Sequence, residues 1–115
     1  MPNRSSSSVR VFFPRWTKEQ LIRQLKSRLP LLADRLPLVR VVLFGSYAKG
    51  KFTAASDIDL LVVYRGEPRD DAYALVRKTL DVPHLEPHIY TLDEFEGVRT
   101  TIQRMVRDGV VLFER

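Results

Sequence analysis

FGSYAKGKFTAASDIDLLVV, residues 44–63, is the stretch that decides the fold. It contains the end of one apolar run, a Gly-Ser turn, and a second apolar run over 58–63 that two aspartates open. Asp57 precedes the second run and Asp59 stands inside it, although ionised carboxylates are costly to remove from water. The pattern predicts two buried strands whose neighbouring ends carry polar groups with a chemical role.

The aspartates are the first part of that pattern. Residues two apart in a strand point to the same face, about 6.5–7 Å apart along the chain, so Asp57 and Asp59 should project side by side. Two parallel carboxylates repel each other, and a divalent cation with oxygen ligands, such as Mg²⁺, removes the repulsion. Alternatively, Ser56 and Asp57 only mark a turn and Asp59 pairs with a lysine. The aspartate pair alone leaves both interpretations open.

The Gly-Ser turn is the second part of the pattern. Gly45 lets the backbone turn sharply after the first strand, and the Ser46 hydroxyl and nearby amides can then face a phosphate. Lys49 and Lys51 add positive charge close by. Because neighbouring strands would bring the turn to the same sheet edge as the aspartates, we expect a nucleotide there. The turn would contact its phosphates, and the aspartates would hold the metal that bridges them.

This combination resembles the signature of the nucleotidyltransferase superfamily that includes DNA polymerase beta. That signature is Gly-Ser, a spacer of about ten residues, and Asp-x-Asp, and here Gly45, Ser46, Asp57 and Asp59 match it. GSYAKG and SDIDLLVV fit the usual text of the minimal nucleotidyltransferase (MNT) group closely. The resemblance implies an enzyme that uses Mg²⁺ and three carboxylates to move a nucleoside monophosphate onto a hydroxyl acceptor. The nucleotide expected is AMP, taken from ATP.

The third carboxylate implied by the resemblance should lie on the next strand, in LEPHIYT. Glu86, His88 and Tyr90 share one face of that strand. Glu86 is the candidate for the third metal ligand and for the base that takes the proton of the acceptor hydroxyl. Aligning the family pattern on the TLDEF segment that follows the strand would instead place His88 at the third position. The base would then be an imidazole, or the enzyme would be impaired. The sequence leaves both assignments open.

A second phosphate-binding motif competes for the same residues. Residues 45–51 read G-x-x-x-x-G-K, which is most of a P-loop. Phe52 stands where a P-loop has the Ser or Thr that ligates Mg²⁺. Only residues 52–56 separate Lys51 from the next strand, too few for the helix that a P-loop requires. We therefore reject the P-loop interpretation.

The periodicity of the remaining segments predicts α/β architecture, a small mixed sheet flanked by helices as in the polymerase beta-like nucleotidyltransferases. Thr17 should cap the first helix with Gln20 as capping-box partner, and Pro30 should kink or restart it. Strands are expected at 38–44, 58–64, 85–90 and 110–113. Helices are expected from Thr17 to about 36, over 70–80, and from Thr91. Thr91 should cap the last helix with Glu94 at its third position, and the apolar stripe of that helix is Phe95, Val98, Ile102, Met105 and Val106.

The length of 115 residues predicts a single domain over 11–115 after a disordered tail at 1–10. The chain has no cysteine, which excludes disulfides and thiolate metal sites. No apolar run approaches the roughly 20 residues of a membrane helix, and the N-terminus lacks the apolar core of a signal peptide. We therefore expect a cytoplasmic protein.

Charge and length bear on partners. Residues 1–52 carry a balance of +9 and residues 53–115 a balance of −4, which suits nucleic acid, a phosphate-bearing ligand or an acidic partner. Nucleic acid is disfavoured, because the aromatic platforms of a single-strand binder and helix-turn-helix text are missing. A chain this short should need another protein to position the acceptor.

The family resemblance implies what that partner is. Minimal nucleotidyltransferases are often encoded beside small HEPN proteins, and some act as antitoxins by adding AMP to the HEPN ribonuclease. The alternative function is a non-catalytic module of the same fold that binds a nucleotide or docks to a partner. The acceptor, the preferred nucleotide and self-association stay open at this level.

Overall fold

The computed structural model describes residues 16–53 and 55–115, and the tail expected at 1–10 lies outside them. The helices are α1 (Lys18–Arg35), α2 (Ser46–Lys49), α3 (Ala72–Leu80), α4 (Leu92–Gly97) and α5 (Arg99–Met105). The strands are β1 (Leu38–Phe44), β2 (Ile58–Tyr64), β3 (Leu85–Thr91) and β4 (Val110–Glu114). No helix among the described residues has the length and apolar character needed to cross a membrane.

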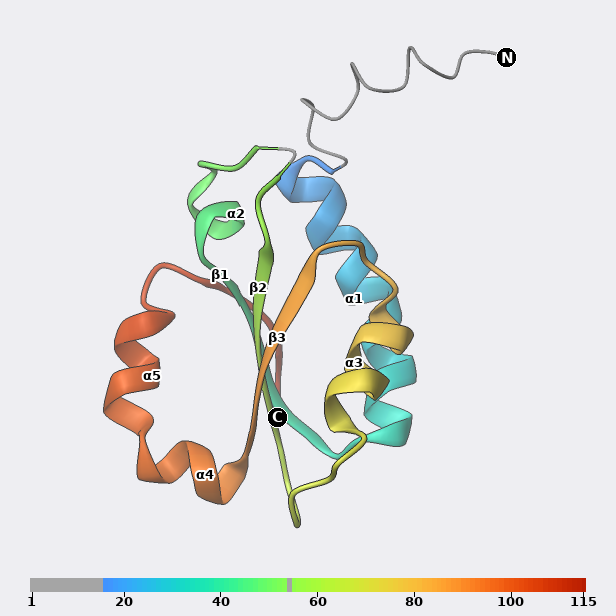
Figure 1. Cartoon of the computed structure of the whole chain (residues 1–115), viewed down its shortest axis with the longest axis vertical. Coiled ribbons are helices and arrows are strands. Elements are labelled where there is room, and N and C mark those ends of the chain that lie inside the picture. The colour runs from blue at the N-terminus through green and yellow to red at the C-terminus, as the bar shows by residue number, and fades with distance from the viewer. Residues whose placement is uncertain (1–15, 54) are drawn as a thin grey trace.

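The strands form one mixed sheet in the order β3-β2-β1-β4. β1 runs antiparallel to both of its neighbours, β2 and β4, whereas β2 and β3 are parallel. Helices α1 and α3 cover one face of the sheet, and α4 and α5 lie on the other (Figure 1). The predicted fold class, a small mixed sheet flanked by helices, is thereby confirmed.

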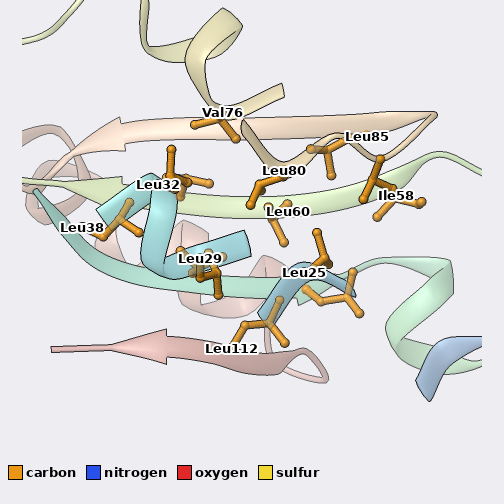
Figure 2. Close-up of a cluster of buried hydrophobic side chains, with 14 of the residues drawn as sticks. Leu25, Leu29, Leu32, Leu38, Ile58, Leu60, Val76, Leu80, Leu85 and Leu112 are labelled. Carbon is orange, nitrogen blue, oxygen red and sulfur yellow. The ribbon is translucent and has the colours of Figure 1, made fainter. Parts of the chain in front are cut away.

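Alternate residues of the strands belong to two separate cores. Along β2, Ile58 and Leu60 belong to the core on the α1 and α3 side, where leucines of helices and strands meet (Figure 2). Leu61 and Val63 belong to the core on the α4 and α5 side. Fully burying one such side chain contributes about 1.5–3 kcal/mol to the stability of the fold, so these residues determine which face of β2 points to which core. Asp59 therefore points to the α4 and α5 side.

Helix α1 begins and ends close to the predicted bounds, but it is not interrupted at Pro30. Thr17 and Gln20 form both hydrogen bonds of the capping box. Pro30 lies inside one continuous helix, so of the two effects expected there, a kink or a restart, the restart does not occur. Buried leucines precede and follow the proline on the sheet-facing side, and their packing holds the helix together across the missing backbone donor. They are Leu21, Leu25, Leu29 and Leu32.

The last helical region differs more from the prediction. Thr91 and Glu94 form the expected capping box, but two short helices, α4 and α5, replace the single helix. Val98 breaks the helix with φ −130° and ψ 25°, next to Gly97, and both residue types are poor helix formers. The residues of the predicted apolar stripe are therefore divided between two helices with different axes. Val98 and Met105 are 44% and 40% exposed, while the other predicted members are at least partly buried.

Candidate functional site

The turn after β1 lies directly beside the second aspartate. Phe44, the last residue of β1, is paired with Asp59 of β2. Gly45 follows with φ +79° and ψ −156°, a conformation that is essentially restricted to glycine. A Cβ atom at this position would lie 3.2 Å from Asp59 Cγ and closer still to Oδ2. The glycine thus serves two needs, the turn itself and the close approach of the carboxylate.

The segment after the glycine is anchored to α1. Ser46 begins the single turn of α2, and Tyr47 is buried with its ring stacked on Phe52 at a centroid distance of 3.9 Å. Burial raises the pKa of the Tyr47 phenol. Lys18 Nζ donates a hydrogen bond to the Ala48 carbonyl at 2.7 Å. These contacts fix the backbone that precedes Lys49, whose side chain is exposed.

The same segment is not a P-loop. Lys51 leads into a loop, and the next regular element of the chain is β2 rather than a helix. The rejection of that motif from the sequence is therefore confirmed.

The two aspartates differ in exposure. Asp57 precedes β2 and is exposed, whereas the Asp59 side chain is 29% exposed. Strand periodicity gives both the same facing, toward the α4 and α5 side of the sheet. The structure therefore places Gly45, Ser46, Asp57 and Asp59 at one end of the β1–β2 pair.

Strand β3 brings the side chain of His88, rather than that of Glu86, into contact with Asp59. His88 Nε2 lies 3.3 Å from Asp59 Oδ1, and the His88 ring is 5.1 Å from that of Phe44. In the parallel register, Glu86 is the residue opposite Asp59. Its carboxylate, however, accepts a hydrogen bond from the Tyr73 hydroxyl at 2.8 Å. Both candidates for the third position thus lie next to Asp59 along the sheet, but with different side-chain partners.

The donor set at this edge suits Mg²⁺. Asp57 and Asp59 offer carboxylate oxygens, the ligands that Mg²⁺ prefers, and Gly45 leaves open the space at Asp59 Oδ2 that a side chain would fill. Across residues 16–53 and 55–115, no three His, Cys, Asp or Glu side chains already form a metal-binding group. Two carboxylates plus substrate phosphates nevertheless make an ordinary Mg²⁺ site.

Tyr73 is a neighbour of the candidate base Glu86 that sequence reasoning missed. It lies on α3, is 44% exposed and contacts Glu86. The guanidinium carbon of Arg77, four residues later, lies 5.9 Å from the centre of its ring. The spacing of residues along α3 does not indicate the contact with Glu86, because that contact depends on how α3 packs beside β3.

The combination of this fold with a Gly-Ser turn beside an Asp-x-Asp strand defines a nucleotidyltransferase-type site. A family model described as a nucleotidyltransferase domain matches residues 18–108. The chain belongs to this family, which confirms the resemblance predicted from the motif. No curated protein matches the chain significantly.

Solved structures share the fold at low sequence identity. A proposed nucleotidyltransferase from Sulfolobus solfataricus is 24% identical, with a TM-score of 0.60 over 86% of this chain and 85% of that one. A chain of a toxin–antitoxin complex with AMP-PNP is 21% identical, with a TM-score of 0.56 over 78% and 73%. A complex of a tri-AMPylated Shewanella oneidensis HEPN toxin with an MNT antitoxin gives 22% identity, with a TM-score of 0.52 over 82% and 73%. At such identities the likeness establishes the fold alone.

Proposed function

We propose that this chain is a Mg²⁺-dependent nucleotidyltransferase that moves AMP from ATP onto a hydroxyl acceptor. The observation that supports this most is the approach of Gly45 to Asp59 Oδ2. This closeness brings the Gly-Ser turn, which we assign to the phosphates, next to the aspartates at one end of the sheet. Membership of the nucleotidyltransferase domain family supports the same reaction class.

Each residue of the site has a proposed role. The Ser46 hydroxyl and the neighbouring amides contact the distal phosphates, and Lys49 adds positive charge there. Asp57 and Asp59 would hold Mg²⁺ together with the substrate phosphates, while Glu86, whose carboxylate contacts Tyr73, would act as the base. A Mg²⁺ ion held there would neutralise part of the negative charge of the phosphates.

The proton of the acceptor hydroxyl has a proposed destination. Glu86 lies in register with Asp59 on the edge strand β3, so an acceptor can reach its carboxylate from solvent. General-base catalysis by such a group contributes roughly 10²–10⁴ in rate. His88 contacts Asp59 and would orient that carboxylate rather than accept the proton.

The proposed acceptor is a HEPN-type protein, for which the chain would act as the antitoxin. Support comes from the structural neighbour in which an MNT antitoxin accompanies a tri-AMPylated HEPN toxin. We place this reaction in the cytoplasm, where ATP is abundant.

Labelled ATP tests the proposal. The chain is incubated with Mg²⁺ and ATP labelled on the α-phosphate, with and without a purified HEPN protein, and Asp59→Asn is the inactive control. Label on the partner with the parent chain, and none with Asp59→Asn, is the expected result. Equal labelling by both chains would overturn the assignment of Asp59.

A second candidate function is a nucleotide-binding or docking module without catalysis. The observation in its favour is that the Glu86 carboxylate is bonded to Tyr73 and not gathered with the aspartates. Mg²⁺-dependent ATP binding with no transfer to the partner would favour this second function.

A further inference from the structure

The proposed base already has a hydroxyl partner within this chain. Tyr73 donates its phenolic hydrogen bond to Glu86 Oε1 at 2.8 Å. A general base must lie within about 2.6–3.2 Å of the group whose proton it takes. The distance between Tyr73 and Glu86 therefore meets the geometric requirement for an acceptor and its base.

The location of the phenol fits the same role. Glu86 is opposite Asp59 in the β2–β3 register, and adjacent strands lie about 4.7–4.9 Å apart, so the carboxylate that the phenol contacts belongs to the residue beside Asp59. The Arg77 guanidinium carbon lies 5.9 Å from the centre of the Tyr73 ring, so a positive charge stands beside the phenol.

Tyr73 also differs from the other tyrosines of the chain in exposure. It is 44% exposed, whereas Tyr47 and Tyr64 are each 3% exposed and Tyr90 is half-buried. Of these four, Tyr73 therefore offers its hydroxyl most openly to a bound nucleotide.

We propose that Tyr73 is a self-modification site, to which the chain transfers AMP from ATP. This inference rests on the proposed function and extends it to a tyrosine acceptor in the same chain. The phenol oxygen attacks the α-phosphorus of ATP while Glu86 takes the phenol proton. The bond from the α-phosphorus to the bridging oxygen breaks, and pyrophosphate leaves with that electron pair. The product is a tyrosyl-AMP phosphodiester.

Intact-protein mass spectrometry tests the transfer. After incubation with Mg²⁺ and ATP, the parent chain should gain the mass of one AMP, and peptide mapping should locate it on Tyr73. Tyr73→Phe and Asp59→Asn should gain nothing, while Tyr90→Phe, the matched control on β3, should be labelled like the parent. Because base and acceptor belong to one chain, the labelled fraction at a given time should not depend on protein concentration.

A second readout needs no catalysis. Tetranitromethane nitrates exposed tyrosines, so Tyr73 should react first in the nucleotide-free chain. An ATP analogue with a methylene group between the α- and β-phosphates cannot undergo the reaction, but with Mg²⁺ it should protect Tyr73 from nitration. Protection should be absent in Asp59→Asn. Binding of the analogue without protection of Tyr73 would overturn the proposal.

The two experiments separate this inference from the proposed function. If the chain binds Mg²⁺-ATP and transfers AMP to a HEPN partner, but Tyr73 is neither labelled nor protected from nitration, the proposed function stands and the inference about Tyr73 is wrong. If the chain shows no Mg²⁺-dependent nucleotide binding, both the proposed function and the inference are wrong. AMP found in this chain on a residue other than Tyr73 would also contradict the assignment.

Discussion

Gly45 and Asp59 lie so close that a side chain on the first would displace the second. A Cβ atom at residue 45 would lie 3.2 Å from Asp59 Cγ, with Oδ2 nearer still. The backbone turn that ends β1 and the carboxylate on β2 are thus coupled sterically. Any nucleotide that uses both groups depends on this one glycine.

Gly45→Ala should therefore abolish Mg²⁺-dependent ATP binding and lower the melting temperature. The backbone conformation at residue 45 costs a non-glycine residue of order 1–3 kcal/mol, and the clash with Asp59 adds to it. Gly50→Ala is the matched control, because Gly50 also has positive φ, +74°, but a Cβ there meets nothing within 4 Å. The control should lose some stability and keep ATP binding, measured by calorimetric titration. Intact binding in Gly45→Ala would show that the turn does not shape the site.

Ser46→Ala should weaken ATP binding by about tenfold to a hundredfold, because a hydrogen bond to a charged group contributes roughly 1.5–3 kcal/mol. AMP binding should change much less, since Ser46 is assigned to the distal phosphates. Dissociation constants for the two nucleotides, measured on both proteins, give the comparison. Equal losses for ATP and AMP would mean that Ser46 supports the fold rather than the phosphates.

Substitutions on β3 test the assignment of the base. Glu86→Gln should retain ATP binding and lose about 10²–10⁴ in transfer rate, because a base acts only during the reaction. His88→Ala should have a smaller effect, through the orientation of Asp59. Binding constants and single-turnover transfer rates for both variants provide the test. An active Glu86→Gln beside an inactive His88→Ala would reverse the two roles.

The ion pair between Arg69 and Asp71 gives a pH-dependent prediction. Two hydrogen bonds from the Arg69 guanidinium lower the pKa of Asp71. Because the folded pKa is the lower one, the pair stabilises the fold above the ordinary Asp pKa, about 3.9, and loses this effect as pH falls through the folded value. Urea midpoints of Asp71→Asn and the parent should therefore differ at pH 7 and converge below about pH 4. Asp70→Asn serves as the neighbouring control, and a difference that persists in acid would contradict the ion-pair account.

The strands that carry the site were the most predictable part of the chain. The bounds predicted for β1 and β2 agree with the structure, because a run of β-branched and leucine residues has few other ways to be buried. The adjacency of the turn and Asp59 followed from pairing those strands. Two capping boxes also marked helix starts correctly, since that motif depends only on local residues.

Other features depend on tertiary packing and could not be predicted from local patterns. Pro30 does not end α1, because leucines on both sides of it are buried against the sheet. The break at Val98 divides a stripe whose spacing alone suited one helix. The partner of Glu86 is Tyr73, and the two are brought together by the packing of α3 beside β3, which no sequence spacing expresses.

The central claim is that Asp59 holds the metal through which ATP binds, and calorimetric titration of ATP with and without Mg²⁺ tests it most directly. The titration compares the parent chain, Asp59→Asn and Asp108→Asn, an exposed control with the same change of charge. All three should be folded, and the loss of a repelling carboxylate should leave the melting temperature of Asp59→Asn unchanged or raised. Mg²⁺-dependent binding should persist in the parent and in Asp108→Asn and disappear in Asp59→Asn. Binding of Mg²⁺-ATP by Asp59→Asn as tightly as by the parent would contradict the account.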